Sequence, residues 1–151
     1  MKILLSLIFL IFSSLAFSAG TNNSASDDQG TSVTKDFKNA QKLIYSKKYE
    51  KAIDILISLE DKKPIGFSKA DLYNYLGFAT RKKNNPNYED AEEYYLLALS
   101  IDANHICALE YLGELYIETD RLGQAEELLT KLGTVAGENS VEYKELFDLL
   151  N

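Results

Sequence analysis

Residues 70–105 decide the fold: they read A-D-L-Y-N-Y-L-G-F-A-T-R-K-K-N-N-P-N and then Y-E-D-A-E-E-Y-Y-L-L-A-L-S-I-D-A-N-H. Apolar residues recur three and four positions apart in both halves, which is the spacing of one face of an α-helix. The N-N-P-N stretch at residues 84–87 favours a turn and ends the first helix. The segment therefore predicts two helices joined by a short turn, with Gly77 facing Ala91 so that the helices can approach closely.

The same pattern recurs on both sides of this segment. Small residues mark the second helix of three successive units, at Ala52, Ala91 and Ala125, and the last two are 34 positions apart. Small residues also mark the first helices, at Ala40, Gly77 and Gly113. No stretch of the body shows a sustained period of two, which would indicate a strand. A repeat of this length predicts an array of helix hairpins that stack on one another.

With these residues, the chain resembles the tetratricopeptide repeat (TPR) family over about residues 33–151. The stretch L-E-Y-L-G-E-L-Y at 109–116 is similar to short exported bacterial TPR proteins. The resemblance implies an all-α, right-handed α-solenoid with three hairpins at about 33–66, 70–105 and 106–139. Residues 140–150 place apolar residues among charges, with no further helix after them. They predict a C-terminal capping helix that covers the last repeat.

The N-terminus is predicted to be a secretory signal peptide, residues 1–18. Lys2 supplies a positive charge, residues 3–12 form an apolar run, and Ala16 and Ser18 form a small-residue cleavage site. Cleavage after Ser18 would leave a periplasmic or secreted protein. A retained membrane anchor is the alternative, although the apolar run is shorter than the roughly 20 residues that a spanning helix needs. We therefore expect no stable membrane insertion after cleavage.

Residues 19–32 are predicted to form a flexible leader. The stretch G-T-N-N-S-A-S-D-D-Q-G-T at 20–31 is rich in polar and small residues. Such a composition buries too little apolar surface to offset the entropy of ordering the chain. The folded domain is therefore expected to begin at about residue 33.

Charge and cysteine content narrow the classes of partner. The net charge of -7 argues against nucleic acids and anionic membranes, which require a basic surface. The charge is uneven, because residues 33–69 carry nine Lys against five acidic residues, whereas residues 106–151 carry three basic against ten acidic residues. The single cysteine, Cys107, excludes an intramolecular disulfide. It is expected to be a partly buried helix residue, with an intermolecular disulfide or a reactive thiol as the alternative.

Catalytic and cofactor sites are not indicated. His105 is the only histidine and lies in the D-A-N-H turn, where a helix-start role is expected rather than general-base or metal chemistry. Gly77 and Gly113 stand alone and form no phosphate-binding loop. We therefore predict that the protein is not an enzyme and binds no cofactor or metal.

The family resemblance implies a concave groove lined by the first helix of each repeat. Carried over by alignment, the groove residues are Phe37, Gln41, Ile44, Tyr45, Asn74, Phe78, Arg81, Lys82, Glu110, Glu114, Ile117 and Glu118. Such a groove would begin aromatic, continue as a basic ridge and end acidic, which suits a peptide with apolar anchors and a basic stretch. Packing between repeats is the alternative role for Phe37 and Phe78.

The resulting expectation is a protein- or peptide-binding adaptor of the bacterial cell envelope. Two alternatives remain open at this point. The chain could associate with itself, as a weak homo-oligomer rather than a monomer, through an incompletely capped first repeat. It could also be a non-catalytic auxiliary subunit of an envelope enzyme or assembly complex.

Removal of the predicted cap should destabilise the domain. A chain that ends at Asn139 lacks residues 140–151 and would expose the apolar face of the third repeat. We expect this chain to aggregate or to melt at a much lower temperature than the complete chain, as measured by circular dichroism. An unchanged melting temperature would contradict the assignment of the cap.

Overall fold

The computed structural model describes residues 25–151, and the predicted signal peptide lies outside the described residues. The described part contains seven helices and no strand, which confirms the all-α prediction. The helices are α1 (Ala25–Tyr45), α2 (Tyr49–Ser58), α3 (Lys69–Lys82), α4 (Tyr88–Ile101), α5 (Ile106–Glu118), α6 (Leu122–Ala136) and α7 (Val141–Leu150). None of them is both long and apolar enough to span a bilayer.

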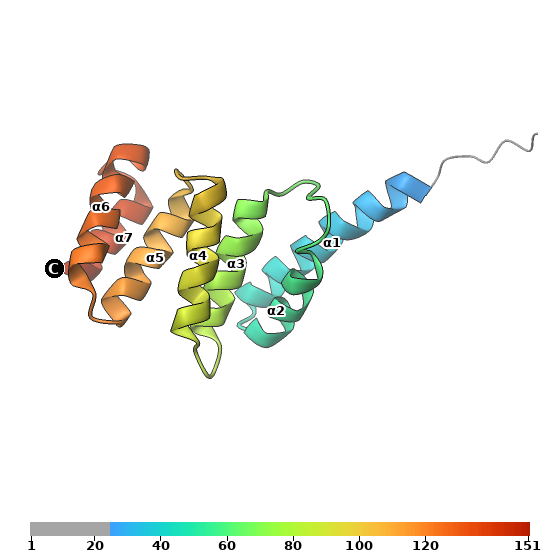
Figure 1. The fold of residues 1–151 in the computed structure, drawn as a ribbon, viewed down its shortest axis with the longest axis horizontal. Helices are drawn as coiled ribbons and strands as arrows, with labels where there is room; N and C mark the ends of the chain where they lie inside the picture. The colour runs from blue at the N-terminus through green and yellow to red at the C-terminus, as the bar shows by residue number, and fades with distance from the viewer. Residues whose placement is uncertain (1–24) are drawn as a thin grey trace, which may run out of the picture.

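The helices stack in chain order along one axis. Helices α1 and α2, α3 and α4, and α5 and α6 pack as hairpins, and each hairpin contacts the next. Each odd-numbered helix also contacts the next odd-numbered one, from α1 to α3, α3 to α5 and α5 to α7. Helix α1 therefore lies at one end of the stack, and α6 and α7 lie at the other (Figure 1). The predicted solenoid with a terminal helix is confirmed.

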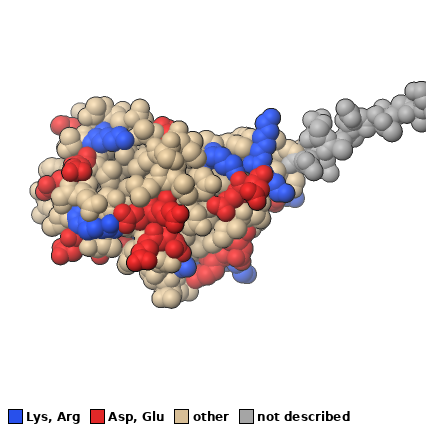
Figure 2. Space-filling view, in the orientation of Figure 1, with Lys and Arg blue, Asp and Glu red and all other residues tan. Residues whose placement is uncertain are grey.

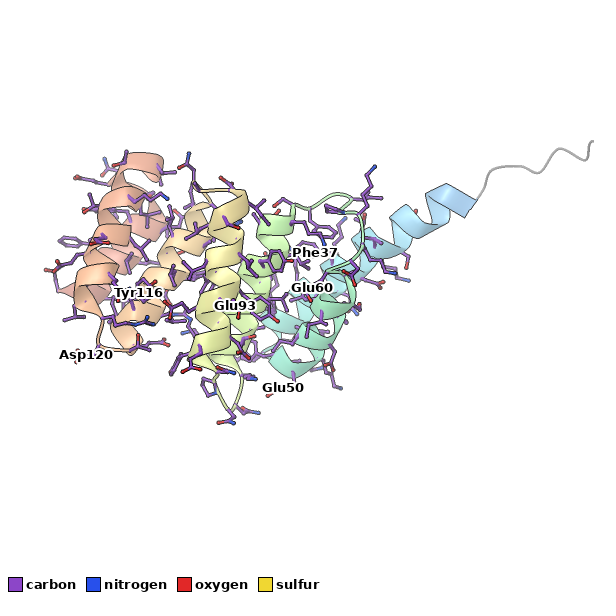
Figure 3. All side chains as sticks on the ribbon, viewed as in Figure 1. Phe37, Glu50, Glu60, Glu93, Tyr116 and Asp120 are labelled. Carbon is purple, nitrogen blue, oxygen red and sulfur yellow. The ribbon has the colours of Figure 1, made fainter. Side chains whose placement is uncertain are left out.

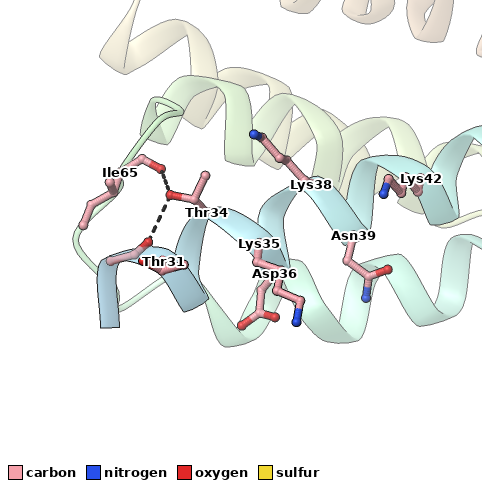
Figure 4. A pocket seen from close by; sticks show the side chains of 9 residues that line it. Thr31, Thr34, Lys35, Asp36, Lys38, Asn39, Lys42 and Ile65 are labelled. Carbon is pink, nitrogen blue, oxygen red and sulfur yellow. Dashed lines mark hydrogen bonds between the residues drawn. The ribbon is translucent and has the colours of Figure 1, made fainter. Parts of the chain in front are cut away.

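Helix α1 begins earlier than predicted. The sequence indicated a flexible leader to residue 32, but the helix already includes Ala25, so residues 25–32 are helical. The loop between α2 and α3 packs against this part of the helix: Thr34 Oγ1 donates hydrogen bonds to the carbonyl oxygens of Gly30, at 3.0 Å, and Ile65, at 2.7 Å (Figure 4). Once this turn is fixed, each further residue adds to an existing helix without the cost of nucleation.

Side chains at the helix starts explain where several helices begin. Ser68 and Asp71 form a reciprocal capping box at the start of α3. Asn87 Oδ1 accepts from the backbone N–H of Asp90, at 3.2 Å, at the start of α4. His105 Nδ1 accepts from the N–H of Ala108, at 3.2 Å, at the start of α5. Each of these bonds satisfies an N–H that the first turn of a helix leaves unpaired. The predicted helix-start position of His105 agrees with this geometry.

Glycines permit the closest helix contacts in the stack. A Cβ atom at Gly77 would lie 2.7 Å from Tyr95 Cε1 and 3.1 Å from the carbonyl oxygen of Ala91. A Cβ atom at Gly113 would lie 2.6 Å from Leu146 Cδ2. Tyr95 and Leu146 are both fully buried, so neither can move aside into solvent. The contact predicted between Gly77 and Ala91 is therefore present, and Gly113 admits the capping helix α7.

Substitution of Gly77 by Ala should test this packing. We expect Gly77→Ala to lower the free energy of unfolding by about 1–3 kcal/mol, because the added methyl group overpacks a closed core. Gly123→Ala is the matched control, since a Cβ atom there meets nothing within 4 Å. Alanine's higher helix propensity should make the control neutral or more stable by up to about 1 kcal/mol. Urea denaturation measures both, and equal effects would contradict the packing argument.

Candidate functional site

The candidate site is the surface formed by α1, α3, α5 and α7, which we call the odd-helix face. Interactions link the helices across it. Gln41 Nε2 on α1 donates to Tyr75 Oη on α3, at 3.0 Å. The rings of Phe78 on α3 and Tyr111 on α5 lie 5.0 Å apart between centroids. Helix α7 packs against α5. The four odd-numbered helices therefore lie side by side.

Aromatic side chains dominate the middle of this face. Tyr75, Phe78 and Tyr111 are partly buried, and we call these three residues the aromatic band. Tyr45, near the end of α1, is 80% exposed. Phe78 and Tyr45 were predicted to line the site, but Tyr75 and Tyr111 were missed. A signal for them was present, because each lies two positions before the glycine that marks its helix.

Three of the predicted site residues belong instead to the interior. Phe37, Ile44 and Asn74 are only 4%, 7% and 4% exposed. Phe37 stacks on Phe67 with the ring centroids 4.0 Å apart, and Figure 3 shows it pointing from α1 into the molecule. Since a ligand cannot reach these side chains, their predicted place in the groove is corrected. The packing alternative that the sequence left open for Phe37 is the one that the structure shows.

The predicted basic ridge and acidic end bind each other. Arg81 is fully buried at its side chain, and its Nη2 lies 2.5 Å from Glu114 Oε2. Arg81 Nη1 lies 3.5 Å from Glu118 Oε1, and Lys82 Nζ lies 3.2 Å from the same oxygen. These ion pairs join α3 to α5. The charges of Arg81, Lys82, Glu114 and Glu118 are therefore largely satisfied within the protein and are not free to select a charged ligand.

Glu110 differs from the other glutamates of α5. It is only 2% exposed. Burial, a hydrogen bond with Glu145 of α7, and the charges of Glu114 and Glu142 raise the pKa of Glu110 to about 8. Its carboxyl group is therefore mostly protonated at neutral pH. Glu110 was predicted to line the acidic end of the groove, but a side chain that is buried in this way does not line it.

The remaining predicted residues take mixed positions. Gln41 is partly exposed and binds Tyr75. Ile117 is partly buried and packs against the cluster formed by Leu109, Leu132 and Leu146, so it supports the core rather than the face. Of the twelve predicted residues, those that remain accessible on the odd-helix face are Gln41, Tyr45, Phe78, Lys82, Glu114 and Glu118.

The single cysteine of the sequence lies on α5. Cys107 is partly exposed. Burial raises the pKa of its thiol, as do the charges of Glu110, Glu142 and Asp71. The thiol is thus mostly protonated at neutral pH, which makes it a poor nucleophile. Within residues 25–151, no group of three or more His, Cys, Asp and Glu side chains is arranged to hold a metal ion.

Comparisons with known proteins were made at the level of families, sequences and structures. No family model matches the chain. A stretch of 72 residues is 35% identical to a protein of Porphyra purpurea described as "Uncharacterized protein ycf37"; it covers 48% of this chain and 40% of that relative. The chain thus covers less than half of the relative's length.

A solved structure extends the comparison to most of the chain. PcrH, in complex with the chaperone-binding region of PopB, superposes with a TM-score of 0.68 and 15% sequence identity. The match covers 79% of this chain and 94% of PcrH. At this identity, the similarity shows a shared fold of stacked helices.

The raised pKa of Glu110 predicts a pH dependence of stability. In the unfolded chain the carboxyl has its ordinary pKa, near 4.3, so between that value and about 8 the folded state binds more protons than the unfolded state. As far as this group is concerned, stability is thus highest at acidic pH and is lost as the pH rises from about 4.3 to about 8, because the folded state disfavours the ionised carboxyl. We expect Glu110→Gln to stabilise the protein by roughly 1–3 kcal/mol at pH 9 and to have little effect at pH 4. Urea denaturation across this range measures the difference, and Glu145→Gln is the companion variant.

Proposed function

We propose that this chain is an exported TPR-type protein that binds another protein or peptide on its odd-helix face and performs no reaction itself. The observation that supports this most directly is the aromatic band together with the 80% exposed Tyr45. Partly exposed aromatic residues are the side chains that most often provide binding energy in protein interfaces. Here they lie on three successive odd-numbered helices, α1, α3 and α5, which suits an elongated ligand.

The similarity to PcrH supports the same proposal. PcrH has this fold and was solved with a segment of another protein bound. A stack of helices offers an extended surface that no single hairpin provides. We therefore place the ligand across α1, α3 and α5, where the interactions between successive odd helices already make the surface continuous.

The ion pairs on the odd-helix face indicate whether the ligand is recognised by its charge or by its apolar groups. Because Arg81 is buried against Glu114 and Glu118, charge selection by these residues would first require the pairs to be broken. Burial of apolar surface therefore supplies most of the binding free energy in this proposal. The ligand we expect has aromatic or aliphatic anchors that fit between Tyr75, Phe78 and Tyr111. A basic stretch in the ligand is no longer required.

The cellular location is part of the proposal and is supported by the N-terminal sequence alone. Lys2, the apolar run at residues 3–12 and the small residues before residue 19 favour export. An auxiliary subunit of an envelope enzyme is the second candidate function. It would use the same face, with the enzyme as the bound protein.

Site-specific photocrosslinking tests the proposed face in cells. A photoreactive amino acid at Tyr45, on the odd-helix face, should form a discrete covalent adduct with the ligand. The matched control places it at Ile57, which lies on α2 and is also exposed, at 47%. We expect adducts at position 45 but not at position 57. The double variant Tyr45→Ala and Lys82→Ala should reduce a crosslink formed from Gln41. Equal crosslinking at positions 45 and 57 would exclude the odd-helix face as the binding surface.

A further inference from the structure

The first helix of the stack differs from α3 and α5 at the positions used for stacking. In α3, Leu72, Leu76 and Ala79 are fully buried and pack with residues of the preceding helix α2. In α5, Leu112 and Leu115 pack in the same way on Ala91 and Tyr95 of α4. Counted from the small residue that marks each helix, the equivalent positions of α1 are Lys35, Asn39 and Lys42. All three are exposed, because no helix precedes α1 in the described stack.

These residues belong to an open depression that we call the N-terminal seat. It is lined by Gly30, Thr31, Thr34, Lys35, Asp36, Lys38, Asn39, Lys42 and Ile65 (Figure 4). Lys35, Lys38 and Lys42 are exposed and form no ion pair with the described residues. Asp36 accepts a hydrogen bond from Ser32, at 3.4 Å, and Ile65 is 43% exposed. The seat thus offers three free cations beside one exposed aliphatic side chain, where the other odd helices receive a neighbouring helix.

A surface with the opposite charge lies on the outside of α4, and we call it the α4 acidic face. It consists of Glu89, Glu92, Glu93, Leu96, Leu97 and Ser100. Glu92 is paired with Arg121, at 2.8 Å, so Glu89 and Glu93 are its unpaired carboxylates within the described residues. Leu96 and Leu97 are 48% and 37% exposed, and the helix contains no Lys or Arg. Acidic side chains gather over α4 in the middle of Figure 2, and Lys or Arg side chains gather where α1 projects. Figure 3 shows Glu93 on the side of α4 that faces the viewer.

The outer faces of the other even helices lack this combination. Helix α2 carries Lys51 near its start, together with Glu50 and Asp54. Helix α6 has two exposed carboxylates, at Glu126 and Glu127, but the leucines that follow them are partly buried. Only α4 among the described even helices joins exposed carboxylates to two adjacent exposed leucines without a Lys or Arg of its own. Among the even helices, charge complementarity therefore selects α4 as the counterpart of the N-terminal seat.

The spacing of the charged and apolar residues along α1 matches their spacing along α4. Thr34, Lys38 and Lys42 are four residues apart along α1, and Ile65 lies beside Thr34 through their hydrogen bond. Leu97, Glu93 and Glu89 are four residues apart along α4 in the reverse direction. Four residues correspond to about 6 Å along a helix axis. An antiparallel contact therefore places Ile65 near Leu97, Lys38 near Glu93 and Lys42 near Glu89.

We propose that the N-terminal seat of one copy binds the α4 acidic face of a second copy, so that the protein associates with itself through two different surfaces. Each copy retains one unused seat and one unused acidic face. Unless the rotation between copies closes a ring, such an interface adds copies without limit. The parts of the odd-helix face on α3, α5 and α7 remain outside the contact, so an assembly would display several ligand-binding surfaces. The ion pairs lie at the protein surface, and association should therefore weaken as salt screens them.

Charge reversal tests the interface with the chain from residue 19, the form expected after signal cleavage. Sedimentation velocity at low salt should show a sedimentation coefficient that rises with concentration beyond that of a dimer, and about 0.5 M salt should reverse the rise. The variants Lys38→Glu with Lys42→Glu, and Glu89→Lys with Glu93→Lys, should each remain monomeric. An equimolar mixture of the two double variants should associate again. The acidic seat of the first variant then faces the basic α4 surface of the second, and the unchanged basic seat of the second faces the unchanged acidic surface of the first.

The matched control is Lys51→Glu with Lys131→Glu, which makes the same change of net charge at exposed positions outside both surfaces. We expect this control to associate as the original chain does. Circular dichroism of each variant checks that it is folded. A monomer at every concentration and at low salt would overturn the proposal. Undiminished association of the two charge-reversal variants, or a mixture that stays monomeric, would overturn it as well.

Discussion

Close approach between neighbouring helices is the constraint on which the rest of the structure depends. At Gly77 and Gly113, any side chain would occupy the space of Tyr95 and Leu146, which are fully buried. The two glycines thus bring α4 against α3 and α7 against α5. The odd helices then lie next to one another, and only in that arrangement can Phe78 reach Tyr111 and Arg81 reach Glu114. The candidate binding face is a consequence of this spacing.

The electrostatics of the molecule change when the helices are assembled. Along the chain, the basic residues of α3 and the acidic residues of α5 look like two binding surfaces of opposite charge. In the stack they become one internal network, and Glu110 holds its proton at neutral pH because burial and the carboxylates of α7 disfavour its charged form. Among the described residues, unpaired charge is found on the outer surfaces of α1 and α4, at Lys35, Lys38 and Lys42 and at Glu89 and Glu93, whereas Glu92 of α4 is paired with Arg121.

Much of the site could be predicted because its residues repeat with the helices. Tyr45 and Phe78 were found from their positions relative to the small residues that mark each helix. Tyr75 and Tyr111 share such a position and could have been found in the same way. Phe37 could not be assigned from the sequence. It becomes buried because Phe67, which precedes α3 in a loop, stacks on its ring, and helical periodicity does not report on loop residues.

The sequence by itself determined the helical class, the repeat and the capping helix, because these follow from local spacing of apolar and small residues that every hairpin repeats. It also showed which residues share one side of each helix. Only the tertiary structure decided which of them stay exposed, which charges pair and where α1 begins. Those properties depend on contacts between residues more than 30 positions apart, such as Arg81 with Glu114 and Thr34 with Ile65, whose distances a one-dimensional pattern does not contain.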